Sequence, residues 1–150
     1  ILWVVSFFTI LFTGNIPESI FGFQAMTLRY GWRAYSYAGF LREPYPPFTF
    51  EMTPADPGGD PATLELERPA SLSRWMIFVK WLLAIPHYII LIFLWIGAGI
   101  VGFIAFFAVI ITGKWPEGLR SFYIGVHRWS YRVTAYVFLL TDVYPPFSLT

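Results

Sequence analysis

The strongest pattern along the chain is an apolar run from Trp75 to Ile111, in which Lys80 is the only charged residue. As one helix, this run would extend about 55 Å, almost twice the roughly 30 Å of a bilayer's hydrocarbon core. Glycines between positions 97 and 102 permit the backbone angles of a tight reversal. We therefore predict a hairpin of two membrane helices, over residues 75–96 and 99–112. A tilted or re-entrant second helix, and a single long helix lying across the bilayer, are the alternatives.

Residues 117–141 follow a different pattern, with helical periodicity and one charged side. This amphipathic helix can lie in the membrane interface with its arginines among lipid headgroups. It can also pack over the membrane helices, with its arginines paired inside a complex. On a helical projection the polar side carries Glu117, Arg120, Ser121, His127, Arg128, Tyr131 and Arg132, and the apolar side carries Leu119, Phe122, Val126, Trp129, Val133, Val137 and Leu140.

The chain contains an internal repeat with a period of 99 residues. Residues 1–50 align without gaps to residues 100–149, and 16 of the 50 positions are identical. The shared signals are Thr-Gly-x-x-Pro-Glu, two arginines four residues apart, and a final Tyr-Pro-Pro-Phe. Self-similarity at a fixed period defines the unit of architecture. We predict the C-terminal half of a first repeat over residues 1–50 and a second repeat over residues 75–150. Because Ile1 aligns with the interior of the apolar run, we expect the chain to begin inside a membrane helix of a longer protein.

Residues 51–74 separate the repeats and form the one plainly aqueous stretch. Five acidic residues between positions 51 and 73 stand against a single arginine. Prolines and glycines at 54–61 predict a turn-rich linker, and the alternation of residues 63–67 predicts a short half-buried strand. The carboxylate spacing fits neither a Ca²⁺ loop nor a catalytic pair, so we interpret the carboxylates as a solvated surface.

Composition indicates the class of protein. Hydrophobic residues make up 57% of the chain and charged residues 13%, and the mean hydropathy is +0.59, unlike a typical soluble domain. We therefore predict an all-α integral membrane protein. Each repeat is expected to contain a transmembrane helical hairpin and an amphipathic interfacial helix, with a short extramembrane strand and linker between repeats. The net charge of +1 and the lack of a basic tract give no support for a nucleic-acid partner. With no cysteine, the chain can form no disulfide or thiolate site.

The distribution of basic residues predicts the orientation. Residues 97–102 contain no Lys or Arg, whereas basic residues flank the opposite end of the predicted hairpin. Cytoplasmic segments of membrane proteins carry an excess of Lys and Arg. We expect a multi-pass protein whose linker and amphipathic helices are cytoplasmic.

Pro86 and His87 stand in the middle of the first predicted membrane helix. Proline removes a backbone hydrogen bond and kinks a helix, and an intramembrane ionisable residue is a candidate functional residue. The favoured interpretation is structural, with a neutral His87 bonded to a carbonyl that Pro86 leaves free. The alternatives are a proton relay or a metal ligand, although the apolar runs offer no partner ligands.

The repeated arginine pairs, Arg29/Arg33 and Arg128/Arg132, are the other candidate site. With Trp129 and Tyr131, they are predicted to contact anionic lipid or a partner protein. The Tyr-Pro-Pro-Phe segments are expected to fix the chain at the membrane interface through their aromatic side chains. An aromatic-groove domain that binds the double proline is the alternative.

Several motifs resemble a known family. They are Ile-Pro-His at 85–87, Thr-Gly-x-x-Pro at 112–116, Arg-Trp-Ser-x-Arg at 128–132 and Thr-Asp-x-Tyr-Pro-Pro-Phe at 141–147. They are similar to those of a bacterial integral-membrane domain of unknown function that often occurs in tandem copies. The resemblance implies the bacterial cytoplasmic membrane but no activity. Leu28 stands where the second repeat has His127, so a role for His127 cannot belong to both repeats.

The leading hypothesis is a non-catalytic membrane subunit or scaffold of a larger membrane protein complex, in contact with membrane lipids and other membrane subunits. The sequence shows no pair of nucleophile and base, no metal-ligand cluster and no cofactor motif, so we expect no catalytic, cofactor or metal site. The alternative is a transporter or channel component, in which the helix broken at Pro86 lines a pathway with His87. An enzyme acting on lipid is the third possibility.

Overall fold

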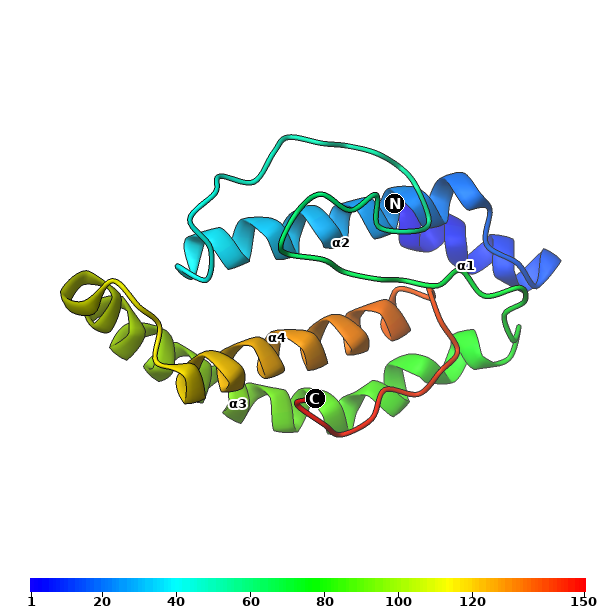
Figure 1. The fold of residues 1–150 in the computed structure, drawn as a ribbon. Coiled ribbons are helices and arrows are strands. Elements are labelled where there is room, and N and C mark those ends of the chain that lie inside the picture. The colour runs from blue at the N-terminus through cyan, green and yellow to red at the C-terminus, as the bar shows by residue number, and fades with distance from the viewer.

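In the computed structural model, which describes residues 1–150, the chain forms four helices and no strand (Figure 1). The helices are α1 (Leu2–Thr13), α2 (Glu18–Ala38), α3 (Met76–Thr112) and α4 (Glu117–Val137). The predicted all-helical class is therefore confirmed, and α4 begins where the amphipathic pattern begins.

The predicted hairpin over residues 75–112 is wrong, because α3 runs unbroken from Met76 to Thr112. Figure 1 shows it as one long, curved helix. The N–H and C=O groups of a continuous helix bond to each other. An apolar run needs this because an apolar surrounding offers the backbone no other hydrogen-bond partner. Gly97 serves packing instead of a turn, because a Cβ there would lie 3.3 Å from Cζ of Phe122, a tight contact, whereas one on Gly102 would lie at an ordinary 3.5 Å from Cε2 of Tyr123. The missing side chain of Gly97 lets the Phe122 ring of α4 approach α3.

The helices end in the same way in the two aligned segments. Gly14 after α1 and Gly113 after α3 have φ values of 72° and 70°, and each donates its N–H to the carbonyl four residues earlier at 2.8 Å. Only glycine adopts this left-handed conformation without strain. After α2 and α4, Phe40 and Leu139 have φ values of 59° and 66°. The 99-residue repeat of the sequence is thus matched by equal local conformations.

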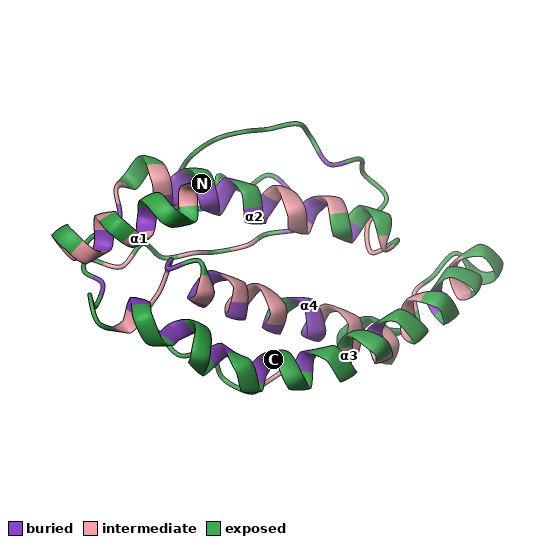
Figure 2. Ribbon diagram, turned by 180° about the vertical axis from the view of Figure 1, so that it is seen from behind, coloured by how far each residue is buried: buried purple, intermediate pink, exposed green.

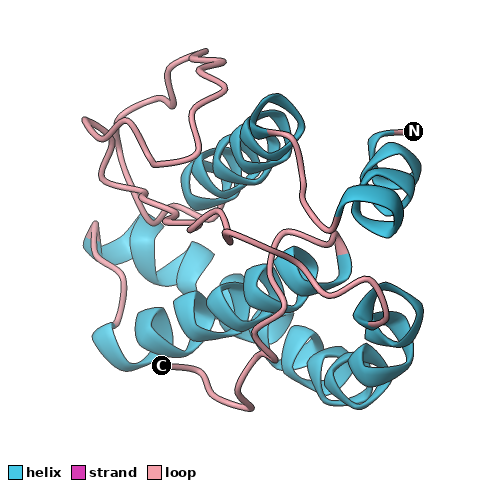
Figure 3. Ribbon diagram, turned by 90° about the vertical axis from the view of Figure 1, so that its right-hand side faces the viewer, coloured by secondary structure: helices cyan, strands magenta, loops and turns pink.

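The helices stack in layers, with α4 between α3 and the layer formed by α2 and the linker (Figure 1). The buried positions of α3 form one narrow stripe, and Figure 2 shows its outer side exposed. Figure 3 shows the N-terminal helix α1 and the longest loops on opposite sides of the molecule. Two apolar clusters hold the layers together. One joins all four helices and contains Ile10, Ile16, Phe21, Ala25, Leu28, Leu72, Ile77, Ala135, Leu139 and Leu140, and the other joins α3 to α4 and contains Ala84, Leu91, Trp129 and Val133.

The predicted strand at residues 63–67 is wrong, because no second strand lies beside it to complete a ladder. The alternation of the sequence is nevertheless visible in the burial. Leu64 and Leu66 pack against the larger apolar cluster, while Glu65 and Glu67 are exposed. This segment is an extended chain that seals the space between α2 and α4.

One helix, α3, is long and apolar enough to cross a membrane. Only 17% of its most apolar stretch is buried, whereas the core helix of a soluble protein is mostly buried. The other apolar helix, α1, has 12 residues, too few for a crossing of about 20 residues. The predicted multi-pass topology is therefore not supported.

Candidate functional site

The first predicted arginine pair, Arg29 and Arg33, lies under the linker and not on an open surface. Their exposed fractions are 3% and 4%. Arg29 donates hydrogen bonds to the carbonyl oxygens of Thr53 at 2.8 Å and Leu64 at 3.3 Å. In this structure, the two guanidinium groups hold the linker onto α2 and have no free face for a lipid headgroup.

Two linker carboxylates complete this network, so the interpretation of all linker carboxylates as a solvated surface is wrong. Nη2 of Arg33 lies 3.0 Å from Oδ1 of Asp56, and Arg42 pairs with Asp60. Burial raises the pKa of Asp56, but amide hydrogen bonds from Leu64 and Gly58 and the charge of Arg33 outweigh it, so its pKa lies below the usual value. Paired in this way, the acidic linker is folded onto α2 as part of the structure.

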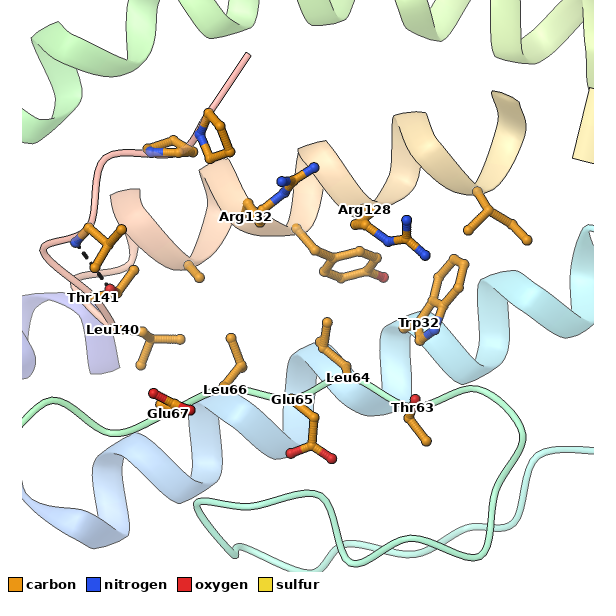
Figure 4. A pocket seen from close by; sticks show the side chains of 16 residues that line it. Trp32, Thr63, Leu64, Glu65, Leu66, Glu67, Arg128, Arg132, Leu140 and Thr141 are labelled. Atoms are coloured by element: carbon orange, nitrogen blue, oxygen red, sulfur yellow. Dashed lines mark hydrogen bonds between the residues drawn. The ribbon is translucent and has the colours of Figure 1, made fainter. Parts of the chain in front are cut away.

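The second arginine pair borders a cleft of about 490 Å³ between α4 and the linker (Figure 4). Arg128 is exposed. Arg132 donates from Nη2 to the carbonyl oxygens of Ser148 at 2.7 Å and Thr150 at 2.8 Å, while its Nε is buried without a partner. Burial and the like charge of Arg128 lower the pKa of Arg132. Arg128, which is exposed, is therefore the member of this pair whose guanidinium group remains open to a ligand.

Tyr131, a predicted contact residue, lies half-buried at the wall of the same cleft. Its ring meets Trp32 of α2 edge-on, with the centroids 5.9 Å apart. Burial, with a smaller effect from Tyr35, raises the pKa of Tyr131 to about 12, so its hydroxyl stays protonated at neutral pH. Tyr131 thus positions α2 against α4 and presents a neutral hydrogen-bonding group near the cleft.

Trp129 and His87 meet each other and not lipid. The indole Nε1 of Trp129 donates to Nδ1 of His87 at 3.1 Å, and the His87 ring stacks on Phe147 with centroids 4.0 Å apart. The predicted bond from His87 to a carbonyl freed by Pro86 is therefore wrong. The reason is that His87 lies on the buried stripe of α3 that faces α4, so its ring points away from the backbone of its own helix. This contact fixes the C-terminal Tyr-Pro-Pro-Phe segment against α3.

His127, which the helical projection placed on the polar side of α4, is 2% exposed. It is surrounded by aromatic rings, with centroids 4.5 Å away at Tyr123 and 4.6 Å away at Trp95. Its Nδ1 lies 2.9 Å from the carbonyl oxygen of Tyr123 and its Nε2 has no partner. Burial lowers the pKa of His127, although the Tyr123 carbonyl acts in the opposite direction. His127 is thus a neutral residue of the interface between α2, α3 and α4.

Lys80 has a partner that the sequence did not reveal. It is 1% exposed, and its Nζ lies 2.7 Å from Oδ1 of Asp142 and donates to the carbonyl oxygen of Thr141 at 2.7 Å. Asp142 also accepts a hydrogen bond from the amide of Ser73. Asp142, in the Thr-Asp-x-Tyr-Pro-Pro-Phe motif, therefore neutralises the charge of Lys80. The only available signal was that an unpaired lysine in an apolar run requires a counter-charge.

The arrangement defines a helical protein with one membrane-compatible helix and a cleft bordered by two arginines and two glutamates. The chain belongs to the family described as Domain of unknown function (DUF4389), which matches residues 1–49 and 74–148. The matched segments contain α1, α2, α3 and α4, and leave out the linker. No curated protein and no solved structure matches the chain.

Proposed function

We propose that this protein is a non-catalytic subunit or scaffold of a larger membrane protein complex, held in the bilayer by α3. The observation that carries the proposal is the exposed apolar surface of α3, where Trp81, Phe93 and Ile111 are exposed by 61%, 70% and 80%. Soluble monomers rarely expose a continuous apolar patch of this extent. Each large apolar side chain removed from water contributes about 1.5–3 kcal/mol, so lipid is the favoured surrounding for this helix.

We propose the bacterial cytoplasmic membrane as the location, with the linker on the cytoplasmic side. A helix of 37 residues is about 55 Å long and exceeds a hydrocarbon core of roughly 30 Å, so α3 tilts strongly or extends beyond the core. The basic residues near the start of α3 and along α4 favour the cytoplasmic side for both. The exposed carboxylates of Glu51, Glu65 and Glu67 favour an aqueous surrounding for the linker.

We further propose that the two aligned segments are copies of one unit. Their equal helix ends and their equal arginine spacing support a duplication. The lipid contact proposed for the arginines is limited to the pair on α4, because the linker covers Arg29 and Arg33.

A transporter or channel component was the alternative. No observation favours it specifically: α3 is not interrupted at Pro86, and His87 is fully buried against Trp129 and Phe147. The scaffold function is therefore the one function that we propose.

The absence of cysteine allows a clean test of the membrane location. Phe93→Cys and Thr63→Cys variants would be treated with a membrane-impermeant maleimide in inverted membrane vesicles. We expect rapid labelling at position 63 and protection at position 93 until detergent is added. Equal labelling at both positions, with release of the protein at alkaline pH, would contradict a membrane-embedded α3.

The scaffold function has its own test. The protein would be purified from its native membrane in mild detergent, and its mass and the co-purifying polypeptides would be determined. We expect a stoichiometric complex with other membrane subunits. A monodisperse protein without partners in native membranes would rule out the proposed function.

A further inference from the structure

The exposed apolar side chains of α3 continue along the whole helix. Trp75, Phe93 and Ile111 follow one another at intervals of 18 residues, which is about five helical turns, so they lie on one line along its outer side. They are exposed by 82%, 70% and 80%. A helix that crosses the bilayer needs an apolar surface over about 20 residues. Apolar exposure from one end of α3 to the other instead favours lipid contact along the whole helix.

The charged linker lies at the level of the middle of α3. Any stretch of about 20 residues within α3, the length of a crossing, contains Trp95. The Trp95 indole donates to Oγ of Ser130 on α4 at 2.9 Å, and its ring lies 4.6 Å from the His127 ring. The His127 ring also lies 5.7 Å from that of Trp32 on α2, and Trp32 lines the same cleft as Thr63 of the linker (Figure 4). These contacts lead from the middle of α3 through α4 and α2 to the linker.

An upright α3 would carry this part of the linker into the hydrocarbon core. Residues 63–67 form neither helix nor strand, and the carboxylates of Glu65 and Glu67 are exposed. The main-chain N–H groups of Glu65, Leu66 and Glu67 make no hydrogen bond within the protein. Lipid-exposed irregular backbone does not occur within the core, and charged side chains there are costly. With α3 parallel to the bilayer surface, the linker lies on the far side of α4, away from lipid (Figure 1).

The charges at the two ends of α3 lead to the same orientation. Arg74 precedes the helix and Lys114 follows it, and both are exposed. Basic residues near the ends of membrane helices favour the cytoplasmic side. A continuous helix that crosses the bilayer would place one of these residues on the opposite side. A helix parallel to the surface keeps both on the cytoplasmic side.

We propose that α3 does not cross the bilayer but lies parallel to its surface within one leaflet. Its outer side contacts the acyl chains of that leaflet, and α4, α2 and the linker lie on the aqueous side. The inference rests on the proposed membrane location, which makes this the cytoplasmic leaflet, and it specifies the lipid surface that α3 binds. Together, α3 and α4 act like an interfacial helix, which inserts its apolar side about 5–10 Å into the boundary between headgroups and acyl chains.

The test determines from which side of the membrane the two ends of α3 react. The chain has no cysteine, so Ser71→Cys and Lys114→Cys each introduce one thiol at an exposed position beyond an end of α3. A membrane-impermeant maleimide would be added to inverted vesicles, which expose the cytoplasmic face, and to spheroplasts, which expose the opposite face. We expect both variants to react at least tenfold faster in inverted vesicles. One reactive variant in each preparation would show that α3 crosses the bilayer and would overturn the inference.

A second measurement needs no substitution and therefore does not depend on how the variants fold. Polarised infrared spectroscopy of the full protein in oriented bilayers of phosphatidylethanolamine and phosphatidylglycerol measures the average tilt of its helices. Spanning helices are tilted by about 0–40° from the bilayer normal. We expect an average tilt beyond this range, because α2 and α4 lie alongside α3 (Figure 1). An average tilt within the range would contradict the parallel orientation.

The Phe93→Cys variant separates this inference from the membrane location on which it rests. Free labelling at position 93 would contradict the membrane location itself. Protection at position 93, with Ser71→Cys and Lys114→Cys reacting from opposite faces, would overturn only the parallel orientation. Reaction of both end variants from the outer face would support the parallel orientation and contradict the proposed cytoplasmic side.

Discussion

At the scale of single residues, Lys80 and Asp142 form an ion pair whose loss is expected to lower stability markedly. Removing one partner of a buried ion pair destabilises a protein by about 3–5 kcal/mol. The Asp142 side chain is 28% exposed, so the effect of Asp142→Asn is expected at the lower end of that range. Asparagine keeps an acceptor for the Ser73 amide but leaves the Lys80 charge uncompensated.

A double-mutant cycle measures this pair. In chemical unfolding in detergent micelles, we expect Lys80→Met to restore part of the stability lost in Asp142→Asn, because it removes the uncompensated charge. Additive losses in the double variant would show that the two side chains do not interact.

His127 gives the second residue-scale prediction, a pH dependence. Its pKa in the folded protein lies below the ordinary 6.5, so the unfolded chain takes up a proton first as the pH falls. Its contribution to stability is therefore complete above pH 6.5 and decreases as the pH drops towards the folded pKa. His127→Leu introduces the residue found at the aligned position 28 and should reduce this dependence.

The measurement is the free energy of unfolding of both proteins between neutral pH and about pH 5. Both proteins retain His87, so the difference between their pH dependences reports on His127 alone. Parallel curves would contradict a buried, neutral His127.

The sequence pointed to the arginine pairs and His87 as candidate residues, but it did not reveal their partners. Lys80 and Asp142 are 62 positions apart, and the loop that brings them together is a property of the packed helices. Likewise, nothing local distinguishes Arg29 from Arg128. Their environments differ because the linker covers only the first.

At the scale of elements, the glycines of α3 are the positions at which a hairpin would turn and a continuous helix would not. A Cβ on Gly99 would meet no atom within 4 Å. Replacing glycine with alanine in a helix stabilises it by up to about 1 kcal/mol. We therefore expect Gly99→Ala to leave unfolding in micelles unchanged or to raise its midpoint. A clear loss of stability would support a reversal of the chain at this position.

Hydrophobic periodicity predicted α4 well, because one side of that helix is polar and the other apolar. It could not predict the course of α3, where nearly all positions are apolar and glycine can serve either a turn or a close helix contact. The extended residues 63–67 show the same limit. Their alternation reflects burial on one side, and a strand also needs a neighbour that the sequence does not specify.

At the scale of the whole molecule, the linker is held on α2 by two carboxylates that also accept backbone amides. Asp56 accepts from Leu64 at 3.0 Å and Asp60 accepts from Ala62 at 2.8 Å. Hydrogen bonds to charged groups contribute about 1.5–3 kcal/mol, a roughly ten- to hundredfold effect on local opening. We expect Asp56→Ala with Asp60→Ala to accelerate amide exchange at Ala62 and Leu64 by such a factor.

The matched control is Glu67→Ala, because Glu67 is an exposed acidic residue of the same linker without an ion pair. Hydrogen exchange followed by mass spectrometry compares the variants. If the control and the double variant exchanged equally fast, the carboxylates would not be what holds the linker.

The contact between Ser73 and Asp142 has a consequence for the segments that flank the α3–α4 pair. The Ser73 amide lies 2.6 Å from Oδ2 of Asp142, so the points where the chain enters and leaves the α3–α4 pair are neighbours in space. The α3–α4 pair therefore closes on itself, and the segments before residue 73 and after residue 142 leave it from one place. A change in the length of either segment would not by itself alter the contacts between α3 and α4.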